Sequence, residues 1–102
     1  MIHVIATIAL RPGVRDAFLA EFHKVVPDVR AEDGCIAYGP AVDLASGIPA
    51  QPAVRDDVVT VVESWESLDH LRAHLAAPHM RAYRERVKDM VVSATLSVLT
   101  PA

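Results

Sequence analysis

The sequence contains one cysteine, no asparagine and no strongly basic segment. The lone Cys35 has no partner within the chain, so it forms no intramolecular disulfide. With a formal net charge of −3 and no cluster of lysine and arginine, the chain is a poor candidate for binding nucleic acid. No apolar run reaches the ~18 residues that cross a membrane. The opening MIHVIATIAL lacks the cationic segment and cleavage site of a signal peptide, so we expect a cytoplasmic protein.

Motifs for nucleotides and metals are also missing. The four glycines form no phosphate-binding loop, and there is no G-x-S-x-G nucleophile motif. We therefore expect no NAD, flavin or ATP. His70 and His74 have the four-residue spacing of an H-E-x-x-H zinc site, but no glutamate stands between them. We expect no metal site.

At 102 residues, the chain is expected to form a single domain that spans residues 1–102. Apolar residues are in modest excess over the usual share of a globular protein. A core of this size cannot use all of them, so the excess predicts a surface that is buried between copies of the chain. We expect a homodimer.

Hydrophobic patterning predicts four strands. The segments rich in β-branched and alternating apolar residues are 3–10, 35–44, 57–65 and 91–99. Pro40 lies inside the second of these, which points to an edge strand or a bulge. Between the second and third strands, residues 45–57 form a long loop by composition, and such loops are often functional.

Three segments have helical periodicity. In the first, Val14, Phe18, Phe22, Val25 and Val29 share one face, and Pro27 is expected to kink or interrupt the helix on its polar side. The second helix is capped by Ser67. Its expected buried stripe consists of Leu68, Leu71 and Leu75. The third begins at Pro78 and turns four residues inward: Met80, Tyr83, Val87 and Met90.

The resulting order, β-α-β-β-α-α-β, predicts an α+β fold. It fits a ferredoxin-like split β-α-β sandwich with an antiparallel four-stranded sheet. Helices on one face of such a sheet leave the other face bare. A second copy of the chain can cover that face, which agrees with the apolar excess.

The segment 63–83 concentrates the reactive side chains, because it holds the only tryptophan and three of the five histidines. Strand alternation places Glu63 and Trp65 on one face. A buried Glu63 needs a partner, for which Arg72, Arg84 or a histidine are candidates. Two interpretations stay open: a structural pair at the rim of the sheet, or the wall of a pocket.

The histidines differ in their expected surroundings. His23 and His70 lie away from the apolar faces of their helices and are expected in solvent, whereas His74 borders a buried face. His79 lies in the first turn of its helix, where the helix dipole disfavours an imidazolium. A neutral ring suits a general base, although a capping or surface role fits the position too. Tyr83, four residues on, can meet His79.

Taken together, the pattern E-S-W-x-S-x-x-x-L-x-x-H-x-x-x-P-H-M-x-x-Y at residues 63–83 resembles the antibiotic biosynthesis monooxygenase family. The segments VIATIALRPG, DGCIAYGPAVD and VVESWES extend the resemblance over nearly the whole chain. Within the family, the sequence is most similar to the small bacterial quinol monooxygenases.

This resemblance implies a ferredoxin-like fold that dimerises sheet to sheet into a dimeric α/β barrel, with a pocket between sheet and helices. It implies oxidation of a quinol or related phenolic ring by O₂ without flavin or metal, in which a base deprotonates the ring. His79 and His74 are then the candidate bases, with His79 favoured. The candidate substrate-binding residues are Trp65, which would flank the ring, and Glu63, Tyr83, Met80 and Thr7.

The chain also departs from the family. Relatives that degrade haem use an asparagine on the first strand, near the position of Thr7, and this chain has no asparagine. Haem degradation is therefore not expected. Two alternatives use the same fold: a dimeric protein that binds quinones or similar rings without turnover, and an isomerase of a small polar metabolite.

Overall fold

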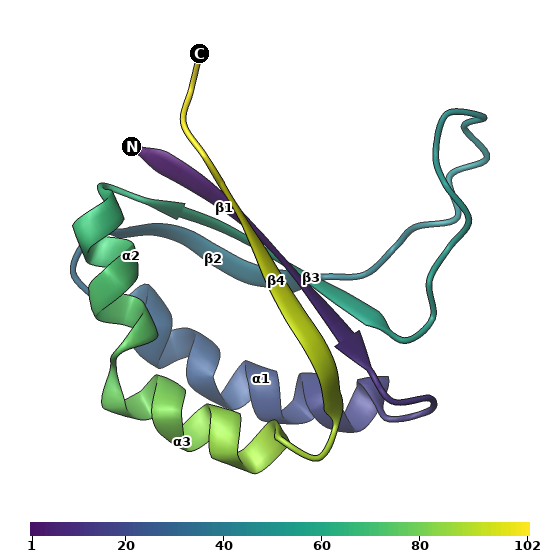
Figure 1. Cartoon of the computed structure of the whole chain (residues 1–102), viewed down its shortest axis with the longest axis horizontal. Helices are drawn as coiled ribbons and strands as arrows, with labels where there is room; N and C mark the ends of the chain where they lie inside the picture. The colour runs from purple at the N-terminus through teal and green to yellow at the C-terminus, as the bar shows by residue number, and fades with distance from the viewer.

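The computed structural model describes residues 1–102 and contains four strands and three helices in the predicted order. Figure 1 labels the elements along the chain. They are β1 (Ile2–Leu10), α1 (Arg15–Arg30), β2 (Cys35–Ala41), β3 (Val58–Trp65), α2 (Leu68–Leu75), α3 (Pro78–Val87) and β4 (Val91–Leu99).

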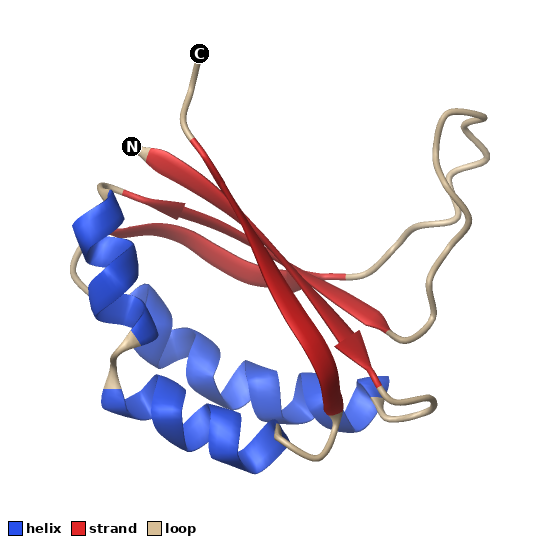
Figure 2. Ribbon diagram, in the orientation of Figure 1, coloured by secondary structure: helices blue, strands red, loops and turns tan.

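The strands form one antiparallel sheet in the order β2-β3-β1-β4. All three helices lie on the same side of this sheet (Figure 2). The predicted α+β, ferredoxin-like fold is therefore confirmed. No helix combines the length and the apolar character needed to cross a bilayer.

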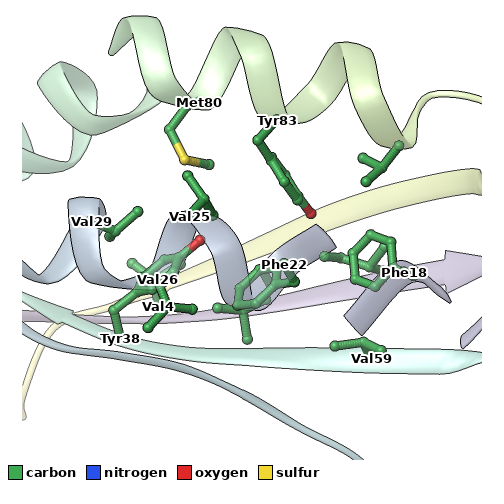
Figure 3. Packing of buried hydrophobic residues seen from close by; sticks show 14 of the residues in the cluster. Val4, Phe18, Phe22, Val25, Val26, Val29, Tyr38, Val59, Met80 and Tyr83 are labelled. Carbon is green, nitrogen blue, oxygen red and sulfur yellow. The ribbon is translucent and has the colours of Figure 1, made fainter. Parts of the chain in front are cut away.

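The core fills the layer between the sheet and the helices. Alternate residues of β1 point toward the helices and are buried: Val4, Ala6, Ile8 and Leu10. From the opposite side, α1 contributes Phe18, Phe22, Val25, Val26 and Val29, and α3 contributes Met80 and Tyr83 (Figure 3). Val87 of α3 is buried in the same layer. The predicted inward faces of α1 and α3 are thus largely confirmed.

Aromatic rings hold α1, α3 and β2 together. The ring of Phe22 stacks on Tyr38 of β2 with centroids 5.6 Å apart. Tyr83 of α3 meets Phe22 edge to face at 5.7 Å, and Phe18 in the same way at 6.2 Å. Offset and edge-to-face contacts of this kind are the favoured geometries for aromatic pairs.

Two expectations about the helices are wrong in part. α1 continues past Pro27 to Arg30, so the proline does not interrupt the helix, and it lies on the exposed side as expected. In α2, Leu68 and Leu75 are 42% and 38% exposed, while His74 is buried. The helix is rotated from the predicted stripe, and a histidine can occupy the buried position because Glu32 binds its ring nitrogen.

The second strand is shorter than predicted and ends at Ala41. Pro40 lies within it, and β2 is an edge strand, as the proline indicates. In the loop that connects β2 to β3, Asp43 accepts hydrogen bonds from the Arg55 side chain through both carboxylate oxygens. This pair joins the two ends of the loop. This pairing holds the pKa of Asp43 down at about 2.

The aromatic core generates a prediction about stability. Phe18 is fully buried and does not line the cavity described below, so Phe18→Ala should lower the free energy of unfolding by about 3–5 kcal/mol. His23→Ala, on the exposed side of the same helix, should stay within about 0.5 kcal/mol of wild type. Urea denaturation measures both. A loss below 1 kcal/mol for Phe18→Ala would contradict the packing described.

Candidate functional site

A cavity of about 410 Å³ lies between the sheet and the α2–α3 side of the molecule. Its size is in the range of small-molecule sites. Twelve of its sixteen lining residues are hydrophobic, and they come from both layers: Ala6, Ile8, Phe22, Val61, Leu75, Met80, Val87, Val91, Ala94 and Leu96, with Tyr38 and Tyr83. Polar character comes from Glu63, His74, Arg84 and Lys88.

Glu63 is a buried carboxyl group in the cavity wall. It points inward from β3, 4% exposed, and its Oε1 accepts a hydrogen bond of 2.9 Å from the indole Nε1 of Trp65. Its partner is therefore Trp65, and not Arg72, Arg84 or a histidine as predicted. Burial raises the pKa of Glu63 to about 6, which the Trp65 hydrogen bond only partly opposes. Near neutral pH the group can therefore exchange a proton with a ligand.

His74 brings an imidazole to the same cavity. Its side chain is 2% exposed, and its ring packs 4.7 Å from Trp65 and 5.4 Å from Tyr38. Nδ1 lies 2.8 Å from Oε2 of Glu32. Burial lowers the pKa of His74 below its usual 6.5, although the Glu32 carboxylate pulls it the other way. The ring is therefore neutral at pH 7 and can accept a proton.

His79, the favoured base in the sequence analysis, lies outside this cavity. Its Nε2 is 2.9 Å from the same Glu32 oxygen, and its side chain faces a separate surface depression beside Lys24, Asp28 and Arg86. The helix that begins at Pro78 presents Met80 and Tyr83 to the cavity instead. The structure therefore brings His74, and not His79, to the cavity, and His79 does not meet Tyr83 in it.

Two other predicted site residues lie elsewhere. Trp65 is fully buried, contacts Glu63 and His74, and does not line the cavity. Thr7 lies on the opposite face of the sheet, because its neighbours Ala6 and Ile8 point into the cavity. Met80, Tyr83, Glu63 and His74 are brought together as expected.

Sequence reasoning missed Tyr38, Phe22 and Glu32 as site residues. Tyr38 lies opposite Glu63 in the sheet, so it shares the inner face, but this register is not visible in the sequence. Burial raises the pKa of Tyr38 and of Tyr83, so both hydroxyls stay protonated at neutral pH. They can donate hydrogen bonds to a ligand oxygen in the cavity.

His70 is 29% exposed, so it is only partly solvated and not fully so as predicted. Its Nδ1 is 2.6 Å from the Ser67 hydroxyl, and the ring packs against Gly34, whose φ of +79° permits the tight turn there. With the exposed carboxylates of Asp33 and Glu66, it forms a group with ligand atoms within 4.8 Å of one another. This group lies away from the cavity and includes none of its residues.

The family model described as antibiotic biosynthesis monooxygenase matches residues 1–86. The chain belongs to this family. The Escherichia coli K12 protein named probable quinol monooxygenase YgiN is 47% identical over 103 residues, covering 99% of this chain and 98% of that protein. The family model and this relative together confirm the resemblance seen in the sequence.

Solved structures share the fold over the whole chain. Rv0793 from Mycobacterium tuberculosis matches with a TM-score of 0.79 and 28% identity, covering 99% of this chain and 94% of that one. A conserved protein from Methanosarcina mazei Go1 matches with a TM-score of 0.83 at 18% identity, covering 99% and 92%. At that identity, the second likeness concerns the fold alone.

The buried Glu63 predicts a pH-dependent stability. Its pKa is higher in the folded than in the unfolded chain, so its contribution is full below pH 4.5 and is lost as the pH rises through about 6. Glu63→Gln keeps an acceptor for Trp65 without the charge. It should raise the free energy of unfolding at pH 8 by up to about 2 kcal/mol, with no gain at pH 4.

Denaturation at the two pH values measures this difference. Glu85→Gln is the matched control, because Glu85 is exposed on α3. It should show no such pH dependence. A Glu63→Gln protein that is less stable than wild type at pH 8 would show that the carboxylate is stabilised and not strained by its site.

Proposed function

We propose that this chain is a cofactor-independent monooxygenase that oxidises a quinol or a related phenolic ring with O₂. The observation that carries the proposal is the buried imidazole of His74 in the wall of an apolar, aromatic cavity. Such a cavity suits a planar ring, and the imidazole suits its acidic hydroxyl. The name of the Escherichia coli relative, a quinol monooxygenase, supports the same substrate class.

In this mechanism the protein supplies binding, a base and exclusion of water. The ring binds among Phe22, Tyr38 and Met80, and its hydroxyl gives a proton to His74. The resulting anion is electron-rich and transfers one electron directly to O₂. The ring radical and the superoxide that form then combine. The Tyr38 and Tyr83 hydroxyls can stabilise the developing oxyanion, and the apolar walls keep water away.

A polar metabolite fits this cavity poorly, because twelve of its sixteen lining residues are hydrophobic. The isomerase alternative is therefore not favoured. Binding of an aromatic ring without turnover uses the same walls and differs only in the part played by His74. Kinetics of a His74 variant separate these two functions.

The proposal predicts that the protein accelerates O₂ uptake by at least one member of a panel of reduced quinones, in the presence of a metal chelator. His74→Ala should lower kcat about 10²–10⁴-fold with a smaller effect on KM. His23→Ala, exposed on α1, is the control and should match wild type. If the panel binds but is not oxidised faster than in buffer, the non-catalytic binding function replaces this one.

We also propose that the protein works as a homodimer. The face of the sheet away from the helices is uncovered, and Val62 at its centre is 48% exposed. On β4, Leu99 lies opposite His3 on this same face and is 47% exposed. Burying these side chains against a second copy would remove apolar surface from water.

Light scattering at micromolar concentration should therefore give twice the 11.1 kDa mass of one chain. Val62→Lys should shift the mass toward that of a monomer, because it places a charge in the proposed interface. The matched control is Leu44→Lys in the loop, which is also exposed and lies outside the sheet. A wild-type monomer at these concentrations would refute the dimer.

A further inference from the structure

A single carboxylate oxygen joins three segments of the chain. Oε2 of Glu32 lies 2.8 Å from Nδ1 of His74 on α2 and 2.9 Å from Nε2 of His79 on α3. Glu32 itself sits in the turn after α1, where its N–H bonds to the carbonyl of Val29 and its carbonyl accepts from Cys35. Its side chain is only 13% exposed. The acceptor is thus held in place by its own backbone.

The chemistry of this contact determines which nitrogen of His74 is free. An ionised carboxylate has no hydrogen to donate, so both ring nitrogens that meet Oε2 must carry one. A neutral His74 then bears its hydrogen on Nδ1 and has its lone pair on Nε2. Within the protein, only Nδ1 of His74 is hydrogen-bonded, and Nε2 has no partner. Every fully buried side-chain nitrogen or oxygen does have a partner, so Nε2 is not fully buried. It is therefore open to the cavity that His74 lines.

We propose that Glu32 is the positioning residue of His74, holding it as the Nδ1–H tautomer with Nε2 toward the substrate hydroxyl, and that His79 modulates the base by sharing the same carboxylate oxygen. The inference rests on the proposed function and deepens it. In the proton transfer, the substrate O–H bond breaks, a bond from Nε2 to hydrogen forms, and the electron pair stays on the substrate oxygen. The Glu32 charge stabilises the imidazolium that results.

Several other groups face His74 and set the background for its titration. Arg84 of α3 lines the cavity, as do the Glu63 carboxyl group of β3 and the Tyr38 hydroxyl of β2. Among the charges nearest the ring, Glu32 raises the pKa of His74, and His79 and Arg84 lower it. Removing Glu32 and removing His79 should therefore have effects of opposite sign, which a merely structural role would not produce.

The test is ¹⁵N NMR of the imidazole nitrogens in substrate-free protein, titrated with pH. Wild-type His74 should carry its hydrogen on Nδ1. Glu32→Gln, which keeps the shape without the charge, should lower the pKa of His74 by about 1 unit or more, and His79→Gln should raise it. Glu85→Gln, an exposed glutamate on α3, should leave it unchanged.

A wild-type His74 with its hydrogen on Nε2 would overturn the proposal, even if no variant folds. An unchanged titration in a folded Glu32→Gln protein would overturn it as well. In turnover, Glu32→Gln should lower kcat about 10–100-fold and move the acid limb of the kcat/KM profile to lower pH. The NMR measurement needs no substrate, so it tests the positioning by Glu32 separately from turnover. If His74 has the predicted tautomer but the protein oxidises no quinol, the proposed function is refuted and the positioning by Glu32 still stands.

Discussion

Two polar side chains, Glu63 and His74, are buried in a core of only nineteen buried residues, and each is held by a hydrogen bond to a second group. Trp65 donates to Glu63, and the Glu32 carboxylate meets His74. A buried polar group without a partner is costly, so these bonds constrain where β3, α2 and the turn after α1 can lie. The polar ends of both residues open into the cavity between them. The requirement to satisfy buried polar groups thus also shapes the site.

The order and type of the helices and strands could be predicted because they follow from the local pattern of apolar residues along the chain. The β-branched alternation of β1, β3 and β4 and the spacing of Phe18, Phe22 and Val25 in α1 are visible in the sequence. The orientation of α2 could not be predicted, since Leu68 and Leu75 have the spacing of a buried stripe. What decides it is a contact between His74 and Glu32, forty-two residues apart.

The site was predictable in part for the same reason. Strand alternation correctly put Glu63 on the inner face, and the helical face of α3 correctly turned Met80 and Tyr83 inward. The positions of Trp65 and His79 could not be predicted from the face of the strand or helix that carries them. The Trp65 indole lies behind the cavity wall, and the His79 imidazole lies on the far side of Glu32. Glu32 itself is a polar residue in a turn, a setting in which most glutamates are solvated, so nothing local marked it.

The central claim is that the cavity binds an aromatic ring and that His74 takes the proton of its hydroxyl. A chromophoric phenol, whose phenolate absorbs at longer wavelength than the neutral form, tests this without any turnover. Titrated anaerobically at a pH below its solution pKa, it should bind to the wild-type protein as the phenolate. It should bind to His74→Ala as the neutral phenol. A phenol that stays neutral on the wild-type protein, or that ionises equally on both proteins, would contradict the account.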